Sequence, residues 1–232
     1  MQEEIISLQK KTDLNLHRIM CLIGGFMGAY ALLIRCDNLG SAQTSNLIYL
    51  FLNLLGGDIF SFLIRLGGLG LYFAAIEITV VLEKKTHFNL KKYALFAEAV
   101  CLLLLGFLPS QANPVLCLYP IFFMMSTQWC VFHGTAGYNS STIFSTNNFK
   151  QFSLALGSYV LEKDAASRDK MILFANSLIF FHLGVVISFF ACKLCQVKAC
   201  WLLAAPLAIA LYLVIKEEQL EVVSAQFSAQ SA

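Results

Sequence analysis

The sequence predicts an all-α, polytopic integral membrane protein with six spanning helices and two short helices that each cross half of the membrane. The first observation is composition: of 232 residues, 58% are hydrophobic and only 13% are charged, whereas soluble domains average about 45–50% apolar and about 25% charged residues. The second is that several apolar runs reach the roughly 20 residues needed to cross a hydrocarbon core. The third is an uneven distribution of Lys and Arg along the chain.

The predicted membrane domain covers residues 17–216 and lies between a polar N-terminal segment (1–16) and a polar C-terminal tail (217–232). The N-terminal segment carries acidic residues before any apolar run, and it lacks the basic start and cleavage site of a secretory signal. The first spanning helix is therefore expected to remain in the protein. The tail ends in VSAQFSAQSA, whose small and polar residues predict disorder.

Six long apolar runs predict spanning helices, and two shorter, more polar runs predict half-membrane helices at about 44–56 and 146–160. Each short helix would be roughly 18 Å long, about half of a 30 Å core. Helices lying flat on the membrane surface are the alternative, which suits NNFKQFSLAL better than NLIYLFLNLL, since the latter is apolar nearly all round. The spanning helices are expected at about 17–36, 58–82, 92–109, 114–133, 170–192 and 199–216.

The placement of Lys and Arg favours six spans over eight, because cytoplasmic loops gather positive charge. With six spans and both termini in the cytoplasm, three basic residues lie outside, Arg65 lies within a span, and twelve of the 16 lie inside. If the short helices also spanned, seven basic residues would lie on the cytoplasmic side and seven on the outer side. The twelve are Lys10, Lys11, Arg18, Lys84, Lys85, Lys91, Lys92, Lys150, Lys163, Arg168, Lys170 and Lys216.

The two short segments are similar to each other: TSNLIYLFLNLLG begins at Thr44 and TNNFKQFSLALGS begins at Thr146. Each follows one long apolar run and precedes two more, so the chain divides into repeat units at about 17–109 and 114–216. Because three spans is an odd number, the second unit is expected to be inverted in the membrane. Inverted units with broken helices recur in transporters and channels. Chance similarity of two short apolar windows is the alternative.

The combination of GGFMGAYALL and SAQTSNLIYL with MMSTQW and SSTIFSTNNFKQFSLAL resembles the bacterial DUF1275 family of small integral membrane proteins, also called YoaK-like. The likeness runs from about Gly24 to Tyr212. It implies a six-span protein of the bacterial cytoplasmic (inner) membrane, without an established chemistry. Members of the family typically carry Asp where this chain has Gly28, and Gly-Leu-Gln-Asn-Ala where it has residues 126–130. Their second Thr-Gly-Asn corresponds to residues 146–148.

The starts of the two short helices predict a site for a small polar or anionic solute. A helix that begins at membrane depth leaves about four backbone N–H groups unpaired, which hydroxyl and amide side chains can cap and which attract anions together with the helix dipole. The alternative is that these side chains only satisfy the backbone and join helices. The residues expected at the site are Gln43, Thr44, Ser45, Asn46, Gln128, Thr146, Asn147 and Asn148.

Ionisable residues within the spans are candidates for charge or proton coupling, because they are costly in lipid and often functional. Glu77 and Glu98 are expected at similar depth on neighbouring helices, where two like charges would favour one protonated carboxyl. Arg65, roughly 10 Å from the outer end of its helix, suits an anion counter-charge. Snorkelling to the interface, or pairing with nearby lysines, is the alternative.

The cysteines predict an alternative class of function, a membrane thiol–disulfide oxidoreductase. Cys192, Cys195 and Cys200 lie in CKLCQVKAC near the expected outer face, where Cys36 ends the first span. A C-x-x-C pair there is the pattern of disulfide exchange. A membrane scaffold without transport is a further alternative, which a dry interior lined only by Leu and Phe would favour.

The function expected from the sequence is passage of a small solute, through a transporter or a channel, rather than enzymatic activity. No catalytic residues, metal ligands or cofactors are expected, because the four His lack metal-like spacing and no Ser-His-Asp or paired-carboxylate pattern is present. Basic clusters with interleaved aromatics, which would indicate nucleic acid, are absent. The expected partners are the solute and the lipid bilayer, and Gly-rich helix faces leave a homodimer open.

Overall fold

The computed structural model describes residues 2–35 and 39–230. This part of the chain is all-α except for one antiparallel hairpin of two-residue strands, which confirms the predicted all-α class. The elements in chain order are α1 (Gln2–Ile34), α2 (Gln43–Leu55), α3 (Ile59–Lys85), α4 (Leu90–Phe107), the 3₁₀ helix η1 (Leu116–Leu118), α5 (Tyr119–Val131), β1 (Gly134–Thr135), β2 (Tyr138–Asn139), α6 (Thr146–Glu162), α7 (Ala165–Cys195), the 3₁₀ helix η2 (Gln196–Leu203) and α8 (Ala204–Gln230).

Three stretches of helix within the described residues are long and apolar enough to cross a membrane. They are α1, α3 and residues Ala165–Phe227, which contain α7, η2 and most of α8. Large apolar side chains are exposed along the bundle; Phe60 and Phe96, for example, are each 70% exposed. Such extensive apolar surface is stable against lipid rather than against water.

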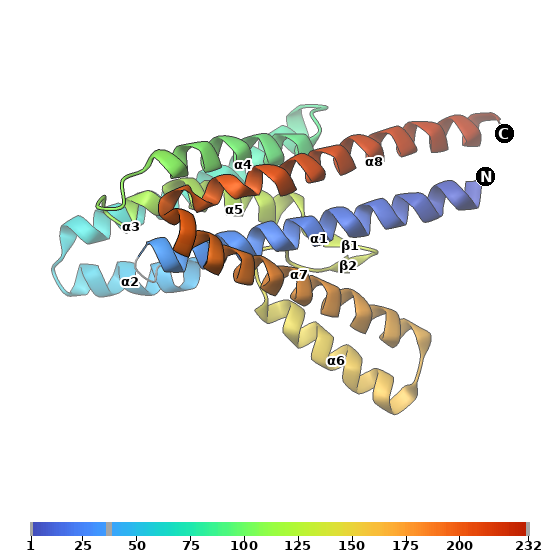
Figure 1. Cartoon of the computed structure of the whole chain (residues 1–232), viewed down its shortest axis with the longest axis horizontal. Coiled ribbons are helices and arrows are strands. Elements are labelled where there is room, and N and C mark those ends of the chain that lie inside the picture. Colours follow the sequence, from blue (N-terminus) through green and yellow to red (C-terminus); the bar gives the residue numbers. More distant parts are fainter. Residues whose placement is uncertain (1, 36–38, 231–232) are drawn as a thin grey trace.

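The helices form an elongated bundle in which both termini lie at the same end (Figure 1). α1 packs most extensively against α7 and then against α8, whereas α5 packs against α3 and α4. The short helices α2 and α6 each pack on the helix that follows them, α3 and α7. Figure 1 shows α2 at the end opposite the termini and α6 on the terminal side of the bundle.

Close contacts between helix backbones hold α1 against α7. A Cβ on Gly25 would lie 1.9 Å from the carbonyl oxygen of Phe181, and a Cβ on Gly184 would lie 2.1 Å from that of Leu22. Glycine is therefore required at both positions, in the manner of small-residue packing between membrane helices. The centre of the bundle is closed by side chains that are at most 1% exposed, including Phe26, Met27, Tyr30, Phe122, Met124 and Met125.

The third helix of each half of the chain begins with the same cap. Asp58 accepts a hydrogen bond from the backbone N–H of Ser61 at 3.0 Å, and Asp164 accepts one from that of Ser167 at 2.8 Å. Hydrogen bonds from the side chain and backbone of Ser167 lower the pKa of Asp164, because they stabilise the ionised carboxylate.

Several helix ends differ from the prediction. α1 begins at Gln2 and α8 continues to Gln230, so the expected disorder of the tail is wrong up to that residue. The tail is rich in Ala, Gln and Glu, which favour continued helix. The span expected at 114–133 is shorter than predicted, since α5 begins only at Tyr119 after the turn of η1.

Candidate functional site

Two stretches of eight residues, 39–46 and 141–148, share one hydrogen-bond pattern and are named here the first and second polar turns. In the first, Nδ2 of Asn46 donates to the carbonyl oxygens of Leu39 and Ala42, at 3.0 and 3.3 Å. In the second, Nδ2 of Asn148 donates to carbonyl oxygens at the same offsets, seven and four residues earlier, at 2.6 and 3.3 Å. The two asparagines that align in the sequence are thus structurally equivalent.

The two short helices begin without a side-chain cap. α2 follows Ala42 and α6 follows Ser145, and neither side chain accepts a hydrogen bond from the first turn. Residues 44–46 and 146–148 do not cap these helices, because they lie after the cap positions Ala42 and Ser145, and Asn46 and Asn148 bond backward to carbonyl groups. The first-turn N–H groups are therefore not satisfied by a cap residue, which leaves them for another acceptor.

The second polar turn is buried against α1 and α7 through a cluster that the sequence analysis missed. Nε2 of His17 lies 3.0 Å from Oγ of Ser140 and 3.1 Å from Oγ of Ser177. The Ser140 hydroxyl donates to Oδ1 of Asn148 at 3.2 Å. All four side chains are at most 3% exposed. The signal in the sequence was the hydroxyl run at residues 140–142, directly before the second Thr-x-Asn segment.

Gln128, a predicted site residue, joins α5 to the second polar turn. Its Nε2 donates to the carbonyl oxygen of Met20 at 2.9 Å and to Oγ1 of Thr142 at 3.1 Å. Its Oε1 is buried and has no hydrogen-bond partner among the described residues. The same turn touches α1 one turn further on, since a Cβ on Gly24 would lie 2.1 Å from the carbonyl oxygen of Thr142.

The first polar turn contacts the same two helices at a different level. A Cβ on Gly40 would lie 2.3 Å from Cγ2 of Ile121 on α5 and 3.7 Å from Cβ of Ala31 on α1. Gly24 and Ala31 are seven residues apart, so the two turns are separated by about 10 Å along α1. Both therefore meet α1 near the middle of the predicted span 17–36.

A positively charged side chain of α3, Arg65, lies beside the first polar turn. Nη1 of Arg65 donates to Oδ1 of Asn46 at 3.0 Å, and the guanidinium lies 4.8 Å from the ring centre of Tyr49. Arg65 was predicted as a counter-charge for an anion, and it lies beside a predicted site residue. By contrast, Asn148 in the second polar turn accepts a hydrogen bond from Ser140, whose hydroxyl also contacts His17 and Ser177.

The structure divides the predicted binding residues between the two turns rather than gathering them in one cavity. Between the turns, the interior is closed by residues of α1 and α5 such as Met27 and Met124. Of the predicted residues, Asn46, Gln128 and Asn148 are buried, Gln43 and Ser45 are half-buried, and Thr44, Thr146 and Asn147 are exposed.

The two glutamates predicted to couple charge lie in different surroundings. Glu98 is 0% exposed, and neither carboxylate oxygen has a hydrogen-bond partner among the described residues. Glu77 is exposed on α3. No hydrogen bond or ion pair within the described part of the chain joins them, so the structure does not bring the two carboxyls together.

The cysteines of the alternative prediction are free thiols. Cys192 and Cys200 are buried and Cys195 is exposed. Sγ of Cys200 donates to the carbonyl oxygen of Val197 at 3.2 Å. Cys36 lies outside the described residues. Disulfide exchange at Cys192 and Cys195 stays a prediction.

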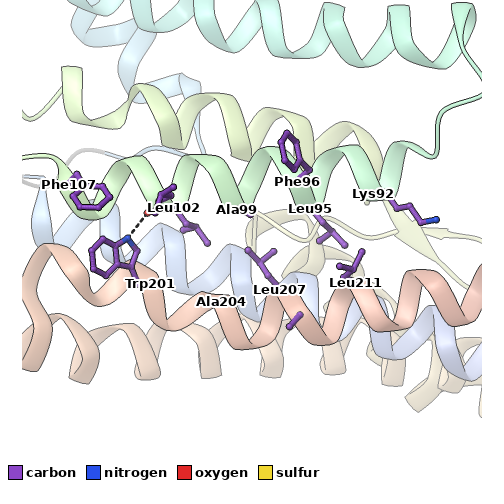
Figure 2. Close-up of a pocket in the computed structure, with 12 residues that line it drawn as sticks. Lys92, Leu95, Phe96, Ala99, Leu102, Phe107, Trp201, Ala204, Leu207 and Leu211 are labelled. Carbon is purple, nitrogen blue, oxygen red and sulfur yellow. Dashed lines mark hydrogen bonds between the residues drawn. The ribbon is translucent and has the colours of Figure 1, made fainter.

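A groove of about 690 Å³ lies on the outside of the bundle, between α4 and α8 (Figure 2). Lys92 lies at one end, and Phe107 and Trp201 lie at the other. Nε1 of Trp201 donates to the carbonyl oxygen of Leu102 at 3.1 Å. The rest of the lining is aliphatic or aromatic, so this groove suits lipid rather than a polar solute.

A smaller hollow of about 430 Å³, lined by both apolar and charged side chains, lies between the N-terminal halves of α1 and α7. Its lining includes Lys10, Asp13, Arg18 and Asn176. Nη2 of Arg18 donates to Oδ1 of Asn176 at 3.0 Å. These two residues directly adjoin His17 and Ser177 in the sequence, so the hollow approaches the second polar turn from the side of the chain termini.

The apolar helices and their exposed surface define an α-helical membrane protein with two matched polar turns in its interior. The chain belongs to the DUF1275 family, described as proteins of unknown function, because the profile of that family matches residues 16–213. This match confirms the resemblance seen in the sequence. Comparison with curated proteins and with solved structures found no match.

Proposed function

We propose that the protein is a membrane transporter for a small polar or anionic solute, built from two inverted units, α1–α4 and α5–α8. Each unit has three spanning helices and one half-membrane helix. The observation that carries the proposal is the equivalence of the polar turns, in which Asn46 and Asn148 donate to carbonyl groups at identical offsets. Such matched breaks in the helical structure, near the middle of the bundle, are typical of transporters built from inverted repeats.

The packing of the helices supports two related units. The first helix of each unit packs on the third and fourth elements of the other: α1 on α7 and α8, and α5 on α3 and α4. Asp58 and Asp164 cap the third helix of their units in the same way. The short helices run from the middle of the bundle toward opposite ends (Figure 1). A two-fold relation with inversion would produce all three features.

The proposed orientation puts both termini in the cytoplasm of a bacterial cell, with the domain in the inner membrane. The termini lie at the same end of the bundle (Figure 1), as six spans require. The connection from α3 to α4 adjoins the basic residues Lys84, Lys85, Lys91 and Lys92, and positive charge favours the cytoplasmic side.

Solute recognition is assigned to the starts of α2 and α6. Their first-turn N–H groups and the positive ends of their dipoles attract oxygen atoms of an anion or a polar solute. Between them the path is closed by about 10 Å of apolar packing that includes Met27, Met124 and Met125. Methionine side chains repack readily, so a rocking motion of one unit against the other would open the path to one side at a time.

A thermal-shift screen against small anionic and polar metabolites, followed by uptake of each hit into proteoliposomes, tests the proposal. The informative variants are Thr44→Val and Thr146→Val, which remove exposed hydroxyls from the first turns and keep the side-chain volume. Ser153→Ala is the matched control, because Ser153 is an exposed hydroxyl two turns further along α6. We expect a hit whose thermal shift and uptake fall at least severalfold in either threonine variant and stay unchanged in the control.

The proposal is wrong if no solute of the panel raises the melting temperature or enters the vesicles. It is equally wrong if hits are found but respond to Ser153→Ala as strongly as to the two threonine variants.

A further inference from the structure

Glu98 is a buried ionisable side chain for which the described part of the chain provides no hydrogen-bond partner. It lies on α4, it is 0% exposed, and both carboxylate oxygens lack a hydrogen-bond partner among the described residues. Glutamate is almost never fully buried unless it is paired, and unpaired buried polar atoms are rare in folded proteins. Within a membrane-spanning segment, such a residue marks a functional site by default.

Contacts between helices fix the depth of Glu98 in the bundle. Nζ of Lys91 on α4 lies 2.7 Å from a carboxylate oxygen of Glu217 on α8, and the two helices run in opposite directions (Figure 1). Because the helices are antiparallel, the residue seven positions after Lys91 on α4, Glu98, lies at the same level as the residue seven positions before Glu217 on α8, Ala210. Ala210 is itself 0% exposed, so α8 presents a buried methyl group at that level.

On α5, the level of Glu98 is that of Thr127 and Gln128. Cys101 on α4 lies beside the backbone of Met124 on α5. The two helices are antiparallel, so the residues three positions away at the next level are Glu98 on α4 and Thr127 on α5. The Thr127 hydroxyl donates within its own helix, to the carbonyl oxygen of Phe123 at 2.9 Å. Oε1 of Gln128 is a buried acceptor without a donor among the described residues.

The titratable groups on neighbouring surfaces lie at other levels. On α4 the next one is Cys101, about one turn away. On α8, Tyr212 lies two residues from Ala210 but is exposed, and Lys216 and Glu217 lie six and seven residues from Ala210, with Glu217 paired to Lys91. On η2 the nearest group is Cys200, whose thiol lies 3.6 Å from the carbonyl oxygen of Leu102. His17 of α1 is bonded to Ser140 and Ser177. None of these contacts supplies a positive charge to the Glu98 carboxyl.

We propose that Glu98 is a proton-binding site in the interior of the membrane domain and that its protonation acts on the second polar turn. An ionised carboxylate without counter-charge or donors is strongly disfavoured in apolar surroundings, so the neutral acid is the stable form. A proton taken from water makes Glu98 a hydrogen-bond donor at the level where Oε1 of Gln128 lacks one. Gln128 in turn donates to Thr142 in the second polar turn.

The proton would be the coupling ion of the proposed transport, and that consequence alone rests on the proposed function. A single carboxyl then replaces the pair of glutamates that the sequence suggested, since Glu77 is exposed.

Infrared spectroscopy of the protein in lipid membranes tests proton binding without any solute. The wild type at pH 7 is expected to show the carbonyl stretch of a protonated carboxylic acid, lost in Glu98→Gln and kept in the control Glu77→Gln. Should Glu98→Gln fail to fold, dicyclohexylcarbodiimide is used on the wild type. The carboxyl oxygen bonds to the central carbon of the reagent, the acid proton moves to a nitrogen, and no group leaves, so peptide mass spectrometry locates the adduct. We expect it on Glu98.

Hydrogen–deuterium exchange tests the link to the second polar turn. After correction for the intrinsic effect of pH, residues 141–148 of the wild type are expected to exchange several times faster once Glu98 ionises, and those of Glu98→Gln are expected to keep one rate. Absence of the acid band, its persistence in Glu98→Gln or absence of the adduct overturns proton binding. Equal pH dependence in the two proteins overturns the link. Neither result depends on whether the protein transports a solute.

Discussion

Replacing Gly24 by alanine should push the second polar turn away from α1. A Cβ at this position would lie 2.1 Å from the carbonyl oxygen and 3.0 Å from the carbonyl carbon of Thr142, and 3.1 Å from Cα of Ile143. All three are backbone atoms, so no side-chain rotation can relieve the contact. Because favourable contacts between heavy atoms lie near 3.5–4.0 Å, the turn would have to move by roughly 1 Å or more.

The expected cost follows from two opposing effects. Overpacking of a well-packed interior costs about 1–3 kcal/mol, while alanine gains up to about 1 kcal/mol over glycine in a helix. Three backbone atoms of the turn would lie too close to the new Cβ, so the overpacking cost falls in the upper half of its range, about 2–3 kcal/mol. Less about 1 kcal/mol for the helix preference of alanine, the net loss is about 1–2 kcal/mol. For a chain of this size, each kcal/mol lowers the melting temperature by about 2–4 °C, so a decrease of about 2–8 °C is expected.

Gly28→Ala is the matched control, because it lies one turn further along the same helix and its Cβ would meet only Cζ of Phe181, at 4.0 Å. We expect its melting temperature to be unchanged or slightly raised. Intrinsic fluorescence in detergent gives the melting curves, and Trp129 is a local probe, since its ring lies 5.4 Å from that of Phe144 in the second polar turn. Equal melting temperatures for both variants, with unchanged Trp129 emission, would refute the described packing.

Three further predictions concern other parts of the fold. Asn148→Ala loses two hydrogen bonds to buried carbonyl groups and should reduce stability by about 1–3 kcal/mol in thermal unfolding, whereas Asn147→Ala, at an exposed neighbour, should change it by less than about 0.5 kcal/mol. A maleimide should label exposed Cys195 in the folded protein and spare buried Cys200, as mass spectrometry would show; labelling of both would contradict the described burial. Because hydrogen bonds from Ser167 lower the pKa of Asp164 in the folded state, its stabilising cap is present above the ordinary carboxyl pKa and lost as the pH falls through the lowered value. Asp164→Ala should therefore lower the melting temperature at neutral pH and weaken its decline in acid; an unchanged acid profile would count against the cap.

The positions of the short helices could be predicted from the sequence because local chemistry marks their ends. α2 lies within one residue of the expected 44–56, and α6 begins at Thr146 as expected and ends two residues late. Polar residues precede both helices, and Gly56 follows the first. The equivalence of Asn46 and Asn148 was visible for the same reason, since it lies within one short segment of each unit.

The buried cluster of the second polar turn could not be predicted, because its members come from distant elements. His17 and Ser177 are 160 residues apart and meet only because glycines bring α1 and α7 into contact. The sequence also could not predict that Glu98 is buried while Glu77 is exposed, for a related reason. Helices that are apolar nearly all round carry no signal for their rotation about the axis, so the sequence indicates depth but not which face points inward.

The hydrogen bonds of the two asparagines determine which atoms remain for a solute. Both donor hydrogens of each amide are directed to carbonyl groups, and each amide oxygen already accepts a hydrogen bond, from Arg65 in the first turn and from Ser140 and Ser141 in the second. Asn46 and Asn148 therefore close the turns. Under the proposed function, contact with the solute falls to the first-turn N–H groups and to the exposed hydroxyls beside them, which is why the threonine variants, and not the asparagine variants, separate a lost binding site from a lost fold.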